Sequence, residues 1–343
     1  MLQHVLTTQP AARRSARRYP ILAATLILAS GVASAQTWSK WYKPPYPASR
    51  FAGPCVFDGA QGYSMLFSGL GHTTVQGPVA LNDTWTFTST GWTQLSPATS
   101  PPPRYGASLA YDQLHGDVLV FAGAFFNNNY IITPMNDTWT WNGTTWTQLS
   151  PAASPSVRYL FAMAYDSAHN QTVVFGGVNL VGYLGDTWVF DGTNWTQKFP
   201  VHTPAQRGSA AMAFDATNQN IVMFGGVNAA GALDDTWVWN GTDWTQMAPA
   251  VSPAARYGSG FAYETAYGNT VLNGGTNLTS NFGDTWAWTG SNWYQEGGDS
   301  TVPTQRFYAC MDYDGTLGEI LMFAGGFGTG HGDIYLDDTW LFK

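Results

Sequence analysis

One stretch of the chain, residues 158–197, decides the fold. It reads RYLFAMAYDSAHNQTVVFGGVNLVGYLGDTWVFDGTNWTQ. An arginine begins the stretch, an acid follows eight positions later, and an apolar run ending in Gly-Gly leads to Asp186-Thr187-Trp188. Phe190 lies two positions after Trp188, and Trp195 lies seven positions after it. Four short segments separated by Asp-, Gly- and Asn-rich turns predict four short β-strands.

The same pattern occurs six times along the chain. The motif Asp-Thr-Trp begins at Asp83, Asp137, Asp186, Asp235, Asp284 and Asp338, and the arginine of each repeat is Arg50, Arg104, Arg158, Arg207, Arg256 and Arg306. Successive tryptophans of the motif are 54, 49, 49, 49 and 54 residues apart. A fixed period of this length indicates a propeller or another repeat array.

The arginine, the Gly-Gly pair, the alternating aromatics and the following tryptophan resemble the kelch repeat, over nearly the whole mature chain. The resemblance implies an all-β fold, a six-bladed kelch-type β-propeller with four strands in each blade. Kelch-type enzymes include the copper enzyme galactose oxidase and a secreted sialic acid mutarotase. This chain resembles them in blade pattern only: no copper-binding tyrosine–cysteine arrangement and no catalytic glutamate–arginine pair can be matched, so the resemblance does not extend to their activities.

The repeat also sets the domain organisation. The propeller is expected over residues 36–343, with blades at about 50–94, 104–148, 158–197, 207–246, 256–295 and 306–343. The sixth repeat ends three residues after Trp340 and lacks its fourth strand. Trp38 stands 12 residues before Arg50, the spacing that separates Trp92 from Arg104. We therefore predict that residues 37–43 supply the outer strand of the last blade, which leaves no open blade edge.

The first 35 residues have the pattern of a secretory signal peptide. Four arginines precede an apolar run from Ile21 to Val32, and Ala33-Ser34-Ala35 follows. The run is shorter than the roughly 20 residues that span a membrane, so we predict cleavage near Ala35 and a secreted or periplasmic protein with no membrane span.

The charge balance of the mature chain narrows the class of partner. Loss of the four N-terminal arginines leaves 10 cations against 22 acids, a net charge of −12. That balance disfavours nucleic acid as a partner, because binding to phosphates needs clustered lysine and arginine. We expect a monomer.

Two cysteines lie in innermost strands of blades that the ring brings together. Cys55 is five residues after Arg50 and Cys310 is four after Arg306. Residues that meet across neighbouring blades should come from opposite strand parities, and five and four satisfy this condition. We predict a disulfide between them in an exported protein; two buried free thiols are the alternative.

The repeated arginines and aspartates allow two interpretations. Six arginines on one rim of the ring could form an anion-binding channel mouth. Their occurrence in every repeat instead favours a structural role, in which each arginine pairs with a nearby aspartate or loop carbonyl. The tryptophans follow the same logic, because 15 of 16 occupy repeat positions, so most are expected in the blade core.

The segments whose length differs between repeats are the basis for predicting a ligand-binding site. From the last glycine of strand two to the aspartate of Asp-Thr-Trp, the chain advances 9 positions in blades 3, 4 and 5, but 14, 14 and 12 positions in blades 1, 2 and 6. The longer segments, expected as loops, are Leu70–Asn82, Ala124–Asn136 and Phe327–Asp337. We predict that they form a raised lip on one face and bind a ligand there. The candidate ligand-binding residues are His72, Phe125, Phe126, Tyr130, His331, Asp333 and Tyr335.

Aromatic side chains together with Asn127–Asn129 suit a glycan or a protein ligand. The favoured function is therefore a non-catalytic binding module without a cofactor. The alternative is a carbohydrate-active enzyme, a metal-dependent sugar oxidase or a sugar isomerase, on the same propeller. In that case His72 and His331, with Asp333 or a tyrosine, could hold a metal such as copper.

Overall fold

The computed structural model describes residues 36–73, 77–127, 131–297, 302–328 and 334–343. The predicted signal peptide, residues 1–35, lies outside the described residues. Every regular element of the described part is a β-strand, and that part contains no helix long and apolar enough to cross a membrane.

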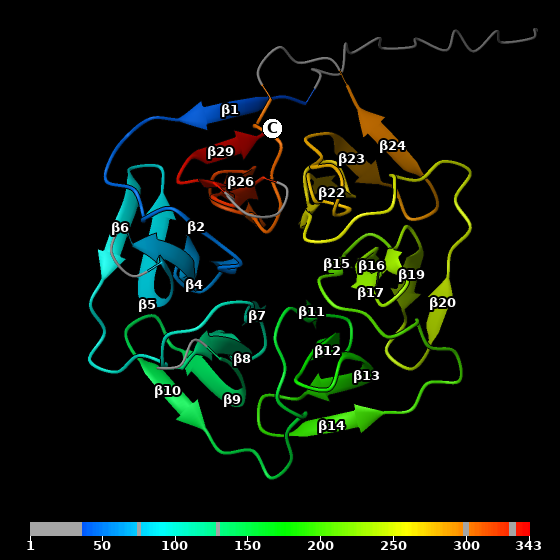
Figure 1. The fold of residues 1–343 in the computed structure, drawn as a ribbon, viewed down its shortest axis with the longest axis horizontal. Helices are drawn as coiled ribbons and strands as arrows, with labels where there is room; N and C mark the ends of the chain where they lie inside the picture. The colour runs from blue at the N-terminus through cyan, green and yellow to red at the C-terminus, as the bar shows by residue number, and fades with distance from the viewer. Residues whose placement is uncertain (1–35, 74–76, 128–130, 298–301, 329–333) are drawn as a thin grey trace, which may run out of the picture. The chain divides into compact units, whose positions relative to one another are not determined.

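The strands form six antiparallel sheets arranged as blades around a central axis (Figure 1). Blade 1 contains β2 (Arg50–Phe51), β3 (Cys55–Asp58), β4 (Tyr63–Thr73), β5 (Gly77–Thr88) and β6 (Gly91–Leu95). Blade 2 contains β7 (Ser108–Asp112), β8 (Asp117–Phe126), β9 (Ile132–Trp141) and β10 (Trp146–Leu149). Blade 3 contains β11 (Ala162–Asp166), β12 (Gln171–Val178), β13 (Tyr183–Phe190) and β14 (Trp195–Lys198).

The second half of the ring follows the same order, with small hairpins added at one face. Blade 4 contains β15 (Ala211–Asp215), β16 (Asn220–Phe224), β19 (Thr236–Trp239) and β20 (Trp244–Gln246), with the hairpin β17 (Val227–Asn228) and β18 (Gly231–Ala232). Blade 5 contains β21 (Gly260–Glu264), β22 (Asn269–Asn273), β23 (Thr285–Trp288) and β24 (Trp293–Glu296). Blade 6 contains β25 (Cys310–Asp314), β26 (Glu319–Phe323) and β29 (Thr339–Phe342), with the hairpin β27 (Gly326–Phe327) and β28 (Ile334–Tyr335).

The last blade is closed by the beginning of the propeller. Strand β1 (Trp38–Trp41) pairs antiparallel with β29, and Trp38 lies opposite Phe342. The predicted fold class, a six-bladed β-propeller whose last blade is completed by the N-terminal strand, is confirmed.

The long segments of blades 1 and 2 differ from the loops that we expected. In blade 1, β4 and β5 continue their pairing beyond a bulge between Phe67 and Gly69, out to Thr73 and Gly77. Blade 2 has the same extension beyond Phe121 and Gly123. Continued pairing satisfies backbone N–H and C=O groups that a loop would leave to water, so the raised part of these blades consists of β-hairpins.

The core lies between the blades and explains the continuous apolar runs. In β12, Val174 packs toward Phe121 and Trp195 of one cluster, whereas its neighbours Val173 and Phe175 pack with Met212 of the next. A strand buried on both faces needs apolar residues at successive positions. The alternation of side chains therefore joins each blade to both of its neighbours.

A tryptophan–threonine hydrogen bond joins each blade to the next one. The indole Nε1 of Trp146 on β10 donates to Oγ1 of Thr84 in blade 1, at 3.1 Å. The other five bonds are 2.9–3.0 Å long and join Trp92 to Thr339, Trp195 to Thr138, Trp244 to Thr187, Trp293 to Thr236 and Trp38 to Thr285. The outer-strand tryptophans are thus part of the blade interfaces.

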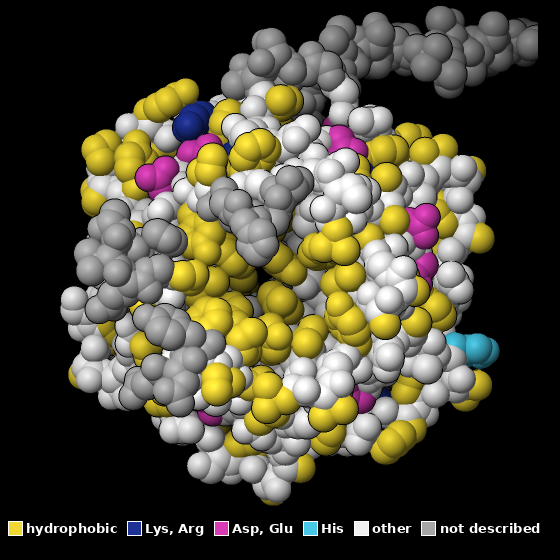
Figure 2. Space-filling model, viewed as in Figure 1, with side chains coloured by type: hydrophobic (Ala, Val, Ile, Leu, Met, Phe, Trp, Pro, Cys, Tyr) yellow, Lys and Arg dark blue, Asp and Glu magenta, His cyan; other side chains and the backbone are white. Residues whose placement is uncertain are grey.

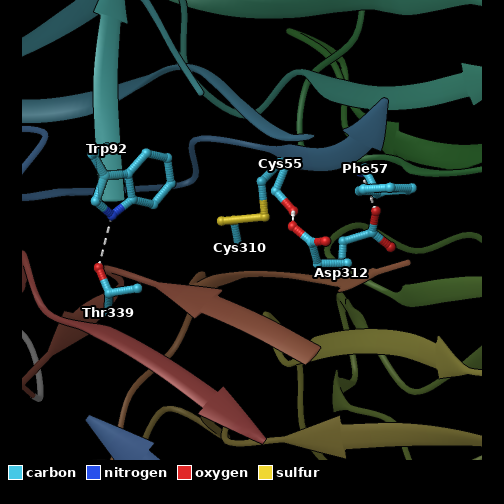
Figure 3. The surroundings of a disulfide bond; sticks show 8 residues. Cys55, Phe57, Trp92, Cys310, Asp312 and Thr339 are labelled. Carbon is cyan, nitrogen blue, oxygen red and sulfur yellow. Dashed lines mark hydrogen bonds between the residues drawn. A yellow bond between two sulfur atoms is a disulfide. The ribbon is translucent and has the colours of Figure 1, made fainter. Parts of the chain in front are cut away.

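The junction between blades 6 and 1 also carries a covalent bond. The Sγ atoms of Cys55 and Cys310 form a disulfide, and the two Cα atoms are 5.4 Å apart (Figure 3). At the same junction, Ser64 Oγ of blade 1 donates to the Asp314 carboxylate of blade 6 at 2.8 Å. The disulfide links residues 255 positions apart, so it ties the start of the propeller to its last blade.

Removal of this disulfide should destabilise the ring. Because the closed loop is long, the bond restricts the unfolded chain strongly, and we expect the double variant Cys55→Ala/Cys310→Ala to lose about 3–5 kcal/mol of unfolding free energy. Urea unfolding of the variant and of the oxidised wild type measures the difference. A wild-type melting temperature that is insensitive to dithiothreitol would contradict this expectation.

Candidate functional site

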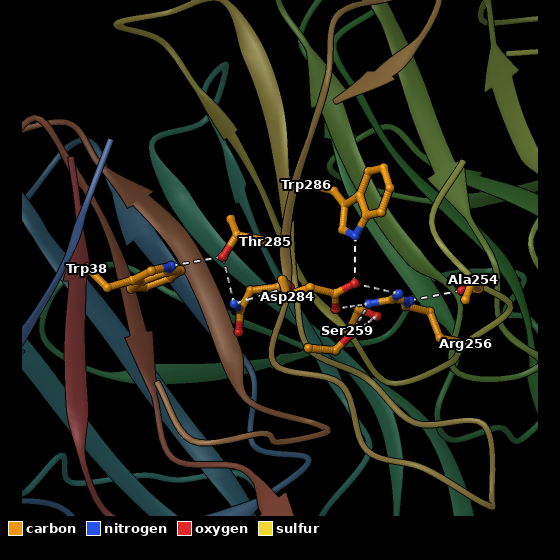
Figure 4. Close-up of polar contacts among 9 residues, drawn as sticks. Trp38, Ala254, Arg256, Ser259, Asp284, Thr285 and Trp286 are labelled. Carbon is orange, nitrogen blue, oxygen red and sulfur yellow. Dashed lines mark hydrogen bonds and ion pairs between the residues drawn. The ribbon is translucent and has the colours of Figure 1, made fainter. Parts of the chain in front are cut away.

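The six repeat arginines lie in the protein interior. Their side chains are 0–1% exposed. In blade 5, Arg256 donates to both carboxylate oxygens of Asp284 at 2.6 and 3.0 Å, and its Nε donates to the carbonyl of Ala254 (Figure 4). The indole of Trp286 donates to the same carboxylate at 2.7 Å. Equivalent bidentate pairs occur in all six blades, with distances of 2.6–3.1 Å.

In each pair the aspartate carboxylate compensates the positive charge of the buried arginine. Burial alone would raise the pKa of each partner aspartate, but the hydrogen bonds and charge of the arginine outweigh it and hold the pKa below its usual value. Each guanidinium is also bonded to backbone carbonyls, for example Arg256 to Gly274. The arginines therefore hold the loops of the blades, and an anion-binding mouth built from them has no support.

Directly after each arginine, the chain forms a ring of backbone hydrogen bonds around the axis. The N–H of the second residue after each arginine donates to the carbonyl of the equivalent residue in the preceding blade. The donors and acceptors are Ala52 to Tyr308, Gly106 to Ala52, Leu160 to Gly106, Ser209 to Leu160, Gly258 to Ser209 and Tyr308 to Gly258, at 2.6–3.1 Å. All six residues have φ between 51° and 66°. Only two are glycines, so the other four hold a left-handed conformation that L-residues rarely adopt.

An incomplete circle of aromatic residues surrounds this ring. The residue directly after each arginine is aromatic in five blades, namely Phe51, Tyr105, Tyr159, Tyr257 and Phe307. Gly208 takes this place in blade 4. A Cβ atom there would lie 2.8 Å from Val178 Cγ2 and 3.5 Å from Tyr183 Cε1, so side chains from blade 3 already fill the space. Hydrophobic side chains gather around the central hollow seen down the axis (Figure 2).

The aromatic contacts are densest at blades 6, 1 and 2. The Phe51 ring meets Tyr335 edge-on at 4.8 Å between centroids and stacks on Tyr308 at 5.9 Å. In blade 2, Tyr105 stacks on Phe126 at 5.4 Å and meets Tyr159 at 6.0 Å. We call the group of Phe51, Tyr105, Phe126, Tyr159, Phe307, Tyr308 and Tyr335 the aromatic mouth.

The structure brings two of the predicted ligand-binding residues, Phe126 and Tyr335, into the aromatic mouth. Phe125 is half-buried and precedes Phe126 on β8, so its side chain points to the other side of that strand. The backbone of His72 belongs to β4, and its side chain is not described. Tyr130, His331 and Asp333 lie outside the described residues, as do residues 128 and 129 of the predicted asparagine run.

The metal site proposed from His72 and His331 therefore stays a prediction. Within the described ranges, no three His, Cys, Asp or Glu side chains group in a way that could hold a metal ion. The prediction from the sequence omits most of the aromatic mouth because it depends on the lengths of the segments between strands two and three. The sequence did contain an indication, since an aromatic residue follows the arginine in five of six repeats.

A channel runs along the axis from the hydrogen-bond ring toward the opposite face. It has a volume of about 680 Å³ and is lined by the inner strands of all six blades. Its lining begins at the level of Ala52 and Tyr308 and ends at the level of Gly59 and Gly315. At the ring end, the Tyr308 hydroxyl and Ser209 Oγ are 2.7 Å apart, which connects blade 6 to blade 4. Burial raises the pKa of Tyr308, so this phenol stays neutral.

The fold and this axis define the class of protein, a six-bladed β-propeller with an aromatic mouth above a central channel. No protein-family model matches the chain, and no protein of curated function matches it. Among the solved structures that resemble it is one described as "Structure of YjhT". The two share 17% sequence identity with a TM-score of 0.64, over 86% of this chain and 95% of that one. This likeness shows the fold alone.

The buried ion pairs generate a prediction about stability. Asp186→Asn removes the charge opposite Arg158, and we expect a loss of about 3 kcal/mol of unfolding free energy at pH 7. The pKa of Asp186 is lowered in the folded state, so the pair stabilises above the unfolded-state pKa of 3.8, and this stabilisation is lost as the pH falls through the lower folded-state value. Urea unfolding at pH 7 and pH 3 measures both effects.

Asp191→Asn is the matched control, because this exposed turn residue accepts backbone hydrogen bonds from Thr193 and Asn194 and faces no arginine pair. The variants should differ at pH 7 and converge at low pH. Equal stability of the two variants at pH 7 would contradict a structural role for the pair.

Proposed function

We propose that this propeller is an exported binding module of the kelch type whose aromatic mouth binds a glycan. The observation that carries the proposal is the cluster of partly exposed aromatic rings at blades 6, 1 and 2, around Phe51, Phe126 and Tyr335. Sugar rings present apolar C–H faces that stack on aromatic side chains, while tyrosine hydroxyls supply hydrogen bonds.

The charge of the mouth favours a neutral ligand. The arginines directly beneath the aromatic residues, such as Arg50 and Arg104, are each bound to an aspartate at 2.7–2.9 Å. They have no free charge to offer to an anionic group. A neutral oligosaccharide fits this surface better than an acidic one.

Export is supported by the sequence and by the redox chemistry of the chain. The basic and apolar N-terminal segment has the pattern of a signal peptide. A disulfide between Cys55 and Cys310 persists best in an oxidising compartment.

The test begins with a glycan array on the purified protein, followed by calorimetric titration of the best ligand. Because each stacking ring contributes on the order of 1 kcal/mol, we expect Phe126→Ala and Tyr335→Ala each to weaken binding about fivefold. Tyr294→Ala is the control, since this exposed tyrosine lies on the outer strand β24. It should bind like the wild type.

Unchanged affinity of both mouth variants would overturn the proposed site. If the array shows no bound glycan and the protein instead captures a protein ligand in a way that Phe126→Ala abolishes, the ligand of the aromatic mouth is a protein and not a glycan. Oxidation or isomerisation of a bound sugar in the same assay would make the protein an enzyme.

A further inference from the structure

One inner-strand position departs from the repeat inside the channel. The sixth residue after the arginine is small and apolar in five blades and acidic in one: Val56, Ala110, Ala164, Ala213, Ala262 and Asp312. All but Ala262 line the channel. A carboxylate therefore stands where the other blades place a methyl or isopropyl group.

No cationic side chain of the described residues lines the channel around Asp312. Among the described residues that line the channel, Asp312 is the one charged side chain, and no lysine, arginine or histidine borders the cavity. The Asp312 carboxylate accepts a hydrogen bond from the backbone N–H of Phe57 at 2.5 Å, beside the Cys55–Cys310 disulfide (Figure 3). Backbone contact orients the carboxylate but does not neutralise it.

The ionised carboxylate of Asp312 would be stabilised by a positively charged ligand. Burial raises the pKa of Asp312 to about 6, against hydrogen bonds that lower it. At neutral pH the group is still mostly ionised. A partly buried charge without an opposite charge is costly, and a cation beside it would relieve that cost.

We propose that the channel is a binding site for a small organic ammonium ion with an apolar body, held by the carboxylate of Asp312. An inorganic divalent ion fits less well, because Ca²⁺ takes six to eight oxygen ligands and the channel offers one carboxylate. The walls suit an apolar body, since they contain Met163, Met212 and Phe261. The volume, about 680 Å³, is in the range of small-molecule sites.

The site is distinct from the aromatic mouth. The Tyr308–Ser209 contact lies at the ring end of the channel, between Asp312 and the other residues of the aromatic mouth. In this proposal the ligand enters from the face of the turns between strands one and two, where Gly59 and Gly315 line the channel. This proposal does not depend on the proposed function.

The experiment compares two probes of equal shape, benzylammonium and benzyl alcohol, by calorimetric titration of the purified protein in physiological salt. We expect benzylammonium to bind at one site per chain, at least tenfold more tightly than benzyl alcohol. In Asp312→Asn and Asp312→Ala the ammonium should bind at least tenfold more weakly, while benzyl alcohol is unaffected by Asp312→Asn. Asp312→Ala introduces the alanine that blades 2–5 carry at the equivalent position. We therefore expect this variant to fold like the wild type.

Asp234→Asn controls for the general negative charge of the protein, because Asp234 is exposed and lies outside the channel. It should bind benzylammonium like the wild type. Equal binding of the two probes, unchanged ammonium binding in both Asp312 variants, or no ammonium binding at millimolar concentrations would overturn the proposal.

A second readout is the pH dependence. Above a pH of about 6 Asp312 is ionised, so ammonium binding should be strong at pH 7.5 and weak at pH 5. The other titratable side chains that border the channel are Tyr263 and four tyrosines whose pKa is raised by burial, namely Tyr111, Tyr165, Tyr308 and Tyr313. The acids at the ends of the adjoining inner strands are Asp58, Glu264 and Asp314.

Because those acids are also present in Asp312→Asn, the difference between wild type and variant isolates Asp312. The raised pKa means that folding favours the protonated carboxyl, so stability due to this group falls as the pH rises from the unfolded value of 3.8 through about 6. Asp312→Asn should therefore melt at a higher temperature than the wild type at pH 7.5 and at a similar one at pH 4. A wild-type advantage at pH 7.5 would contradict an uncompensated charge.

Discussion

The ion pair between the first arginine of each blade and the aspartate of Asp-Thr-Trp is the interaction on which the ring depends. A guanidinium that is almost fully buried is costly without its carboxylate, so the two segments must meet although 28–33 residues separate them. The pair fixes both ends of the segment between strands two and three. That segment can therefore vary in length, as it does between blades 1 and 3, without changing the blade below it.

The three residues of the Asp-Thr-Trp motif make contacts in different places. In blade 5, Asp284 binds Arg256 and the indole of Trp286 within its own blade, whereas Thr285 accepts a hydrogen bond from Trp38 of the closing strand (Figure 4). Adjacent residues thus stabilise the interior of one blade and its interface with the next. Repetition of this unit around the axis fixes the relation of neighbouring blades and allows the ring to close.

Much of this architecture follows from the sequence, because the constraints recur at a fixed spacing. The period predicts the blades, the position of Trp38 predicts the closing strand, and strand parity brings Cys55 near Cys310. The hairpins of blades 1 and 2 were not foreseen, since Leu70–Thr73 and Gly77–Asn82 lack a strong turn dipeptide between them and length alone suggested loops. The backbone hydrogen-bond ring could not be predicted either. Its left-handed residues include Leu160 and Tyr308, and no propensity favours that conformation for them.

A repeat of six equal blades creates six equal environments, so recognition of an asymmetric ligand requires positions that break the equality. Three such positions lie in blade 6: Tyr308 reaches across to Ser209, Asp312 places a carboxylate in the channel, and Tyr335 meets Phe51 at the mouth. Blade 6 is also the blade that two ends of the chain build together, through β1 and β29. Its inner strand β25 carries Asp312 and Cys310, so the disulfide to blade 1 fixes the strand that bears the carboxylate. Closure of the ring and the asymmetry of its axis therefore depend on the same short strand.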